Sequence, residues 1–294
     1  MAGQSVRIGL VQMSASSERS ANLERASNGI ESAARQGAQI VCLPELFASQ
    51  YFCRSEDAKN FDLAEPIPGP TTQAISSIAR RLKVTVLCPV FERRAPGLYH
   101  NSVVLLGPDG AQAGLYRKMH IPDDPLYYEK FYFSPGDLGF VAVKTEAAIL
   151  GPLICWDQWY PEAARLTALR GAQILFYPTA IGWLAQDRAA LGAAQLDAWR
   201  TVQRAHAITN GVFVAAVNRV GSEGETGAGI EFWGHSFVCG PFGVVLAEAG
   251  EAEQVLLADC DLAELEQIRR GWPFFRDRRT DAYAGLTLRW LGED

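Results

Sequence analysis

The sequence predicts an α/β fold of four layers, in which two sheets pack face to face and helices cover the outer face of each sheet. One observation is an internal repeat: residues 37–40 and 171–174 both read Gly-Ala-Gln-Ile, and each continues through an apolar stretch to a proline, Pro44 or Pro178. A second observation is that the predicted strands are mostly continuous apolar runs, as expected when both faces of a sheet are buried. We therefore expect an α-β-β-α sandwich with pseudo-twofold symmetry.

Each half of the chain is expected to run strand, helix, strand, helix, strand and hairpin. Pro161 with Glu162 in the first turn predicts the start of a helix. Gly-Pro sequences at residues 107–110 and 240–243 interrupt strand patterns and predict hairpin turns. Two of the predicted helices cover residues 23–34 and 161–170. The predicted strands cover residues 6–11, 40–43, 84–87, 149–154, 174–177 and 212–217.

We expect a single domain over residues 1–294, because no linker or low-complexity segment interrupts the chain. A hydrophobic content of 48% is enough for one large core. The net charge of -6, from 27 basic and 33 acidic residues, argues against broad binding to nucleic acid or an anionic membrane. No apolar run is long enough to span a bilayer, and the first residues lack the shape of a signal peptide.

The cysteines and histidines point away from disulfides and metal sites. The six cysteines lie far apart without a Cys-x-x-Cys pair, which predicts reduced thiols in a cytoplasmic protein. The four histidines have no metal-ligand spacing, so we predict no metal and no cofactor. Four cysteines lie in or at the end of apolar strand patterns: Cys42, Cys88, Cys155 and Cys239.

Cys155 is the leading candidate for a reactive group, because it follows the apolar run 148–154 and precedes a predicted helix. A thiol at a strand-to-helix turn lies near backbone N–H groups and a helix N-terminus. That setting favours the thiolate and can hold a developing oxyanion. The alternative is a buried cysteine used as a small apolar residue. Two other segments favour the reactive interpretation.

The first of these segments is an apolar strand that ends at Pro44 and is followed by Glu45 with apolar neighbours on both sides. Such a carboxylate is expected to be paired or to have a raised pKa, and a raised pKa suits a general base. Its apolar neighbours disfavour the alternative of a solvated loop acid. In the second segment, Lys118 at a strand end can supply a fixed positive charge, although alone it would be an ordinary surface lysine.

Together these segments resemble the nitrilase superfamily of carbon–nitrogen hydrolases, whose catalytic set is glutamate, lysine and cysteine in that chain order. Glu45, Lys118 and Cys155 match this set position by position, and Glu129 matches a second glutamate that follows the lysine. The resemblance runs from about residue 6 to about residue 286 and also implies the four-layer sandwich. Four segments look most like the N-carbamoylputrescine amidase branch: residues 129–133, 154–162, 176–182 and 275–279.

The resemblance implies hydrolysis through a covalent intermediate, which helps because amide and ureide carbons are poor electrophiles. Cys155 would attack the carbonyl carbon. Glu45 would take the thiol proton, pass it to the departing ammonia and later activate water. Lys118 would stabilise the thiolate and donate to the oxyanion, with the backbone N–H of Trp156 as a second donor. Glu129 would hold Lys118 in place and keep it charged.

A Cys–His pair of the papain type is the competing mechanism. His120 lies too close to Lys118 in sequence to count as independent evidence, and nothing marks His100, His206 or His235 as a base.

The expected substrate, a carbamoylated diamine, carries one ammonium group and therefore needs a carboxylate, while aromatic faces also suit it. Asp123 and Asp124 follow Lys118 closely, and Asp187 is a third candidate; the alternative for each is a solvated loop residue. No arginine lies between residues 119 and 165, which favours a cationic or neutral substrate over a carboxylate-bearing one.

Three further residues are predicted to bound the substrate pocket. Tyr51 follows the Glu45 loop and Trp156 follows Cys155, so their rings can form an apolar wall. Thr179 occupies the place in the second half of the repeat that Glu45 holds in the first. We therefore expect Thr179 to lie at the same end of the sandwich as Glu45.

The expected activity is hydrolysis of N-carbamoylputrescine to putrescine, carbon dioxide and ammonia. The alternatives are an ω-amidase, a nitrilase, a β-ureidopropionase-like carbamoyl-amino hydrolase, or a nitrilase-fold binding protein without catalysis. The complete catalytic set argues against the last of these. The resemblance also implies a homo-oligomer in which a basic and aromatic tail, residues 270–294, contacts a neighbouring subunit, with Glu264 and Glu266 as partners for its arginines.

Overall fold

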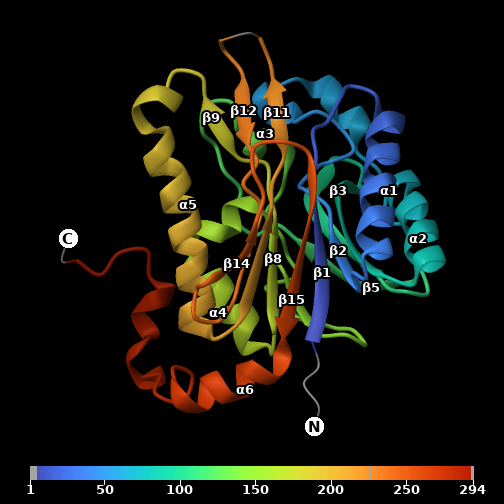
Figure 1. The fold of residues 1–294 in the computed structure, drawn as a ribbon. Helices are drawn as coiled ribbons and strands as arrows, with labels where there is room; N and C mark the ends of the chain where they lie inside the picture. Colours follow the sequence, from blue (N-terminus) through green and yellow to red (C-terminus); the bar gives the residue numbers. More distant parts are fainter. Residues whose placement is uncertain (1–4, 226, 293–294) are drawn as a thin grey trace.

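The computed structural model describes residues 5–225 and 227–292, and within them it contains two six-stranded sheets and one three-stranded sheet. Figure 1 shows α1 and α2 on one side of the two large sheets and α4 and α5 on the other side. The predicted four-layer α-β-β-α sandwich is therefore confirmed.

The first large sheet has a parallel centre and antiparallel edges. Its order is β15-β1-β2-β3-β4-β5, in which β1, β2 and β3 are parallel and the other neighbours are antiparallel. The helices that connect its parallel strands are α1 (Arg19–Arg35) and α2 (Pro70–Leu82). Its strands are β1 (Ser5–Gln12), β2 (Ile40–Cys42), β3 (Thr85–Ala95), β4 (Leu98–Leu106), β5 (Gln112–Arg117) and β15 (Gln254–Asp261).

The second large sheet repeats this plan in the order β6-β7-β8-β10-β13-β14, again with three parallel central strands. The connecting helices are α4 (Pro161–Leu169) and α5 (Arg188–Asn210). Because each strand has a counterpart with the same neighbours, the predicted pseudo-twofold repeat is confirmed. Its strands are β6 (Val143–Lys144), β7 (Ile149–Pro152), β8 (Ile174–Pro178), β10 (Phe213–Val217), β13 (Phe237–Cys239) and β14 (Val245–Glu248).

The local signals read from the sequence agree with the element ends. Helix α4 begins at Pro161, as its start signals predict. Both Gly-Pro turns join antiparallel strands, β4 to β5 and β13 to β14. Helix α6 (Leu262–Gly271) begins after Asp261, whose carboxylate accepts a hydrogen bond from the N–H of Ala263 at 2.9 Å.

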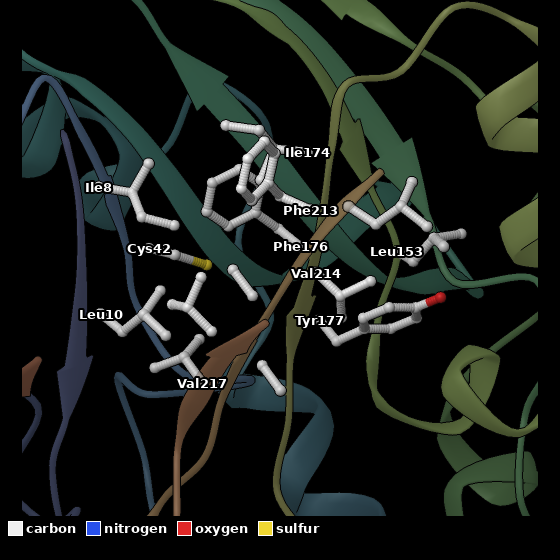
Figure 2. Packing of buried hydrophobic residues seen from close by; sticks show 14 of the residues in the cluster. Ile8, Leu10, Cys42, Leu153, Ile174, Phe176, Tyr177, Phe213, Val214 and Val217 are labelled. Carbon is white, nitrogen blue, oxygen red and sulfur yellow. The ribbon is translucent and has the colours of Figure 1, made fainter. Parts of the chain in front are cut away.

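The main core lies between the two large sheets. Figure 2 shows Ile8 and Leu10 of β1 and Cys42 of β2 packed in one cluster with Phe176 and Phe213 of the second sheet. A separate cluster lies between the first sheet and helices α1 and α2. All six cysteines are buried and unpaired. Apolar strands therefore pack on both faces, as their continuous hydrophobic sequences predict.

The small sheet was not anticipated from the sequence. It consists of β9 (Gly182–Leu184), β12 (Ile230–Trp233) and β11 (Val220–Glu223), which insert after β8 and β10 of the second half. In Figure 1 it rises at one end of the sandwich, close to α3 (Glu129–Tyr132). These insertions have no counterpart in the first half, so the repeat could not reveal them.

The C-terminal tail begins by packing on its own chain. The Phe275 ring lies 5.2 Å from the guanidinium of Arg165 and 5.1 Å from that of Arg269. Of the two partners expected for the tail arginines, Glu266 pairs with Arg270 at 2.7 Å. The tail then continues through η4 (Thr280–Ala282) and η5 (Ala284–Thr287), where its apolar side chains are exposed.

Within the described residues, no helix combines the length and the apolar character needed to cross a membrane.

Candidate active site

Cys155 opens the short 3-10 turn η3 (Cys155–Trp159) that follows β7, and its φ of 39° lies in the left-handed region. A non-glycine residue held there is strained, which requires support from its surroundings. Asp157 gives that support: its Oδ2 accepts hydrogen bonds from the N–H of Ile154 at 3.0 Å and the hydroxyl of Tyr116 at 2.7 Å. The turn that carries the thiol is therefore fixed to β5.

The four residues predicted to form the catalytic set belong to one buried cluster. Lys118 Nζ lies 2.8 Å from Glu45 Oε1 and 2.7 Å from Glu129 Oε2. The side chains of Lys118 and Glu45 are wholly buried, and Glu129 is nearly so. Cys155 is close enough for the charges of all three to act on its pKa.

The surroundings of Cys155 favour the thiol over the thiolate. Burial raises its pKa well above the ordinary value, the negative charge of Glu45 raises it further, and Lys118 only partly opposes them. The direction of this pKa shift does not support the expectation that the strand-to-helix turn favours a thiolate. The reason is that η3 separates the thiol from the N-terminus of α4, while two carboxylates share its buried surroundings. A thiol nucleophile in these surroundings needs a base that takes its proton.

Glu45 has one oxygen free to take that proton. Its Oε1 accepts hydrogen bonds from Lys118 Nζ at 2.8 Å and from Asn101 Nδ2 at 2.7 Å. Its Oε2 is buried and has no partner among the described residues. Since an unpaired buried carboxylate oxygen is costly, a transient donor such as the thiol or water suits this position. Asn101 of β4 was missed by the sequence analysis, because nothing in its local sequence marks it.

Lys118 lies between two carboxylates, and their charges shift its pKa. Burial alone would lower the pKa of Lys118, but Glu129 and Glu45 outweigh burial and hold that pKa well above its usual range. Burial raises the pKa of Glu129 to about 7, even though Lys118 opposes the rise. These shifts favour the charged form of Lys118 and make Glu129 easier to protonate than an ordinary glutamate.

A cavity of about 310 Å³ opens beside Cys155. Among its lining residues are three that were predicted to bind substrate: Trp156, Asp124 and Asp187. No lysine, arginine or histidine of the described chain lines it. The remaining lining residues are mostly apolar or aromatic: Pro122, Pro125, Tyr127, Glu129, Trp159, Ala180, Ile181, Gly182, Leu184, Gln195, Ala198 and Trp233.

The other three predicted substrate residues do not line this cavity. The Tyr51 hydroxyl donates to Glu129 Oε1 at 2.7 Å, so Tyr51 contacts the catalytic cluster rather than the cavity. The Thr179 hydroxyl is buried and donates to the carbonyl of Tyr177 at 2.9 Å. Asp123 and Asp124 are both exposed to solvent, but only Asp124 also lines the cavity. One position along a loop is enough to turn a side chain away, which sequence spacing cannot resolve.

The surroundings do not favour the Cys–His alternative. His120 Nδ1 lies 2.7 Å from Asp157 Oδ1, and its ring stacks on Tyr160 with centroids 3.8 Å apart. This histidine therefore stabilises the η3 turn and is not among the residues that line the cavity.

The backbone hydrogen bonds of the η3 turn begin with the N–H of Asp157, which donates to the carbonyl of Ile154 at 3.0 Å. The preceding N–H, that of Trp156, stays the predicted oxyanion donor.

No group of three or more histidine, cysteine, aspartate or glutamate side chains suited to a metal ion occurs in the described part of the chain.

Comparison with known proteins gives consistent matches over nearly the whole length. Residues 7–270 match the family model described as carbon-nitrogen hydrolase. An N-carbamoylputrescine amidase of Solanum lycopersicum is 44% identical over 287 residues, which covers 96% of this chain and 94% of the relative. A citrullinase of Francisella tularensis subsp. tularensis is 39% identical over 280 residues, covering 95% and 96% respectively. The crystal structure of a carbon-nitrogen hydrolase from Helicobacter pylori G27 superposes with a TM-score of 0.95 at 47% identity, covering 98% of this chain and 100% of that chain.

Proposed function

This chain belongs to the carbon–nitrogen hydrolase family, and we propose that it hydrolyses N-carbamoylputrescine to putrescine, carbon dioxide and ammonia. The observation that carries this proposal is the cavity beside Cys155, which contains unpaired aspartates and no basic side chain among the described residues. The 44% identity to a relative named for this activity supports the same substrate.

The first half of the reaction forms a covalent bond to Cys155. Its sulfur attacks the ureido carbon while the thiol proton passes to Glu45 Oε2, the buried oxygen without a partner. Lys118 and the N–H of Trp156 donate to the oxyanion that develops. Removing one such donor typically costs about 3–4 kcal/mol of transition-state stabilisation. Glu45 then protonates the leaving nitrogen, so ammonia departs and a thiocarbamate of the diamine remains on Cys155.

The second half consumes one water molecule. Glu45 takes a proton from the water as its oxygen attacks the thiocarbamate carbon, and the carbon–sulfur bond breaks. The proton returns to the thiol of Cys155. The released carbamic acid separates into carbon dioxide and putrescine, so the overall reaction uses one water and yields one ammonia. The same carboxylate therefore acts as base, acid and base again, which fits its single free oxygen.

The lining of the cavity suits a chain of methylene groups that ends in an ammonium. Neither Asp124 nor Asp187 makes an ion pair or a side-chain hydrogen bond within the described residues, so both carboxylates are free to bind a cation. Trp156, Trp159 and Trp233 supply apolar and aromatic surface for the methylene groups. A carboxylate-bearing substrate would meet repulsion here instead.

Ammonia release from N-carbamoylputrescine, N-carbamoyl-β-alanine and L-citrulline tests the substrate. We expect the highest kcat/KM for the first. Asp187→Asn and Asp124→Asn should each raise the KM for it by about 10-fold or less, with kcat nearly unchanged, because they remove only a charge that binds the amine. Asp123→Asn is the matched control, since this neighbouring aspartate is exposed and does not line the cavity.

Preference for N-carbamoyl-β-alanine would refute the amine-binding cavity while leaving the nucleophile intact. Preference for L-citrulline would keep an ammonium-bearing substrate but exclude a simple diamine. If none of the three compounds released ammonia, neutral amides would be the next substrates to test and the proposed function would be wrong.

We further propose that the protein forms a homo-oligomer through its C-terminal tail. Supporting this, Leu286, Leu288, Trp290 and Leu291 near the chain end are between 62% and 76% exposed. Removing residues 271–294 should lower the number of subunits per particle measured by analytical ultracentrifugation, and an unchanged number would contradict this role.

We also propose a cytoplasmic location for the protein, because its six cysteines are buried and unpaired. A fluorescent fusion would test this location.

A further inference from the structure

Arg219 is one of the largest fully buried side chains of the described structure, with 1% of its surface exposed. It directly precedes β11, in the second half of the chain, yet its guanidinium reaches the loop that carries Glu45 in the first half. Its Nε donates to the backbone carbonyl of Glu45 at 3.0 Å, and its Nη2 donates to the carbonyl of Leu46. A buried cation aimed at two backbone carbonyls calls for an explanation.

The loop held by Arg219 is conformationally strained. Leu46 has a φ of 50°, in the left-handed region that leucine rarely adopts. Such a residue costs on the order of 1–3 kcal/mol and persists only where its surroundings hold it. Because Leu46 follows Glu45 directly, relaxation of this residue would reorient the Glu45 carboxylate. The two hydrogen bonds from Arg219 oppose that relaxation.

The third contact of Arg219 is with Glu223, which links it indirectly to Glu129 through Tyr51. Its Nη1 lies 3.0 Å from Glu223 Oε1, and Glu223 Oε2 accepts a hydrogen bond from the N–H of Tyr51 at 2.6 Å. The Tyr51 hydroxyl in turn donates to Glu129 Oε1 at 2.7 Å. The polar contacts therefore form a closed ring, which runs through Glu45, Lys118, Glu129, Tyr51, Glu223 and Arg219.

We propose that Arg219 and Glu223 are positioning residues, which hold Glu45 and, through Tyr51, Glu129 at the distances that the reaction requires. This inference rests on the proposed function only in assigning Glu45 and Lys118 to the reaction. It does not depend on which linear amide or ureide is the substrate. Neither residue lines the cavity, and their hydrogen bonds go to the backbone of the Glu45 loop, to each other and to the backbone of Tyr51.

Arginine suits this role because one planar group serves three acceptors in fixed directions. The ion pair with Glu223 offsets the cost of burying its charge, and the guanidinium also lies over the Phe232 ring, 5.7 Å from the centroid. A lysine would keep the charge but could not bond the carbonyls of Glu45 and Leu46 and the Glu223 carboxylate with the same geometry.

Steady-state kinetics of Arg219→Lys and Glu223→Gln test the proposal, with the substrate that wild type turns over best. We expect kcat to fall by about 10- to 100-fold, since small misplacements of reacting groups have effects of this size. KM should stay within about threefold, because the lining of the cavity is untouched. Arg200→Lys and Glu248→Gln are matched controls, since they alter an ion pair on α5 and β14 that does not line the cavity.

A double-mutant cycle separates positioning from general destabilisation. Tyr51→Phe removes only the hydroxyl that reaches Glu129, while Glu223→Gln alters the contact with the Tyr51 N–H. If both act through one ring, the double variant should lose little more kcat than the worse single variant. Additive losses, or a kcat equal to wild type in folded Arg219→Lys and Glu223→Gln, would overturn the proposal. So would a raised KM with unchanged kcat.

Folding is checked by thermal unfolding of each variant at the assay pH. Should Arg219→Lys fail to fold, Glu223→Gln and Tyr51→Phe still give the decisive comparison, because both keep the arginine. Failure of the proposed function would be seen differently, as wild type that releases no ammonia from any tested compound.

Discussion

Replacing Cys155 with alanine is expected to abolish ammonia release, with kcat reduced by at least about 10⁴-fold, because no other thiol of the described residues lines the cavity. The fold should survive the change, since the Cys155 side chain is small and alanine removes only its sulfur atom. Alanine adopts the same backbone conformation at no greater cost than cysteine. The variant should therefore still bind substrate without turning it over.

Isothermal titration of Cys155→Ala with N-carbamoylputrescine, beside a kinetic assay, checks both parts of this prediction. Cys88→Ala is the matched control, because that thiol is equally buried but lies in the cluster between the first sheet and helices α1 and α2. Residual turnover of Cys155→Ala above about one hundredth of wild type would mean that water attacks directly, and the covalent mechanism would be wrong.

Glu45→Gln is expected to lower kcat by about 10³-fold or more, because in the proposed reaction this one carboxylate carries the proton in both halves. Glutamine keeps the shape of the side chain and can still accept hydrogen bonds from Lys118 and Asn101 through its oxygen. Its amide cannot take a proton from the thiol. Single-turnover mass spectrometry should find no rapid build-up of a Cys155 adduct. Glu248→Gln is the control, since it makes the same chemical change in an ion pair that does not line the cavity.

The pH dependence of this variant tests the coupling between the two carboxylates. Burial raises the pKa of Glu129 to about 7, and the negative charge of Glu45 contributes to the rise. We expect wild-type kcat/KM to fall as the pH drops below about 7, because protonated Glu129 holds the Lys118 ammonium less strongly. Removing the charge of Glu45 lowers the pKa of Glu129, so the residual activity of Glu45→Gln should persist to lower pH. An identical acid limb in both proteins would contradict the coupling.

The predicted catalytic set rested on local sequence together with the resemblance to the nitrilase superfamily, which is why it could be named without a structure. Glu45, Lys118 and Cys155 each follow a strand. The turn at Cys155 and the helix start at Pro161 are short-range features set by neighbouring residues. The same reasoning failed for the thiolate, because burial by distant segments, rather than the adjacent helix, governs the pKa of Cys155.

Substrate-facing side chains were harder to identify, because a loop turns neighbouring residues in different directions. Asp124 lines the cavity and Asp123 does not, although both are exposed, and the Tyr51 hydroxyl donates to Glu129 instead of lining the cavity. Trp233 lines the cavity from β12, within a small sheet that the repeat could not reveal. These positions depend on contacts between segments that are far apart in the chain.

The sequence by itself determined the alternation of strands and helices, the twofold plan and the three strand ends that carry the reactive groups. Periodicity, prolines and apolar runs act over a few residues, so they can be read locally. Only the tertiary structure decided which oxygen of Glu45 is free, how Asn101 and Arg219 hold that residue, and which aspartates face the cavity. Those outcomes depend on burial and on directional hydrogen bonds across the two halves, which form only when the sheets pack together.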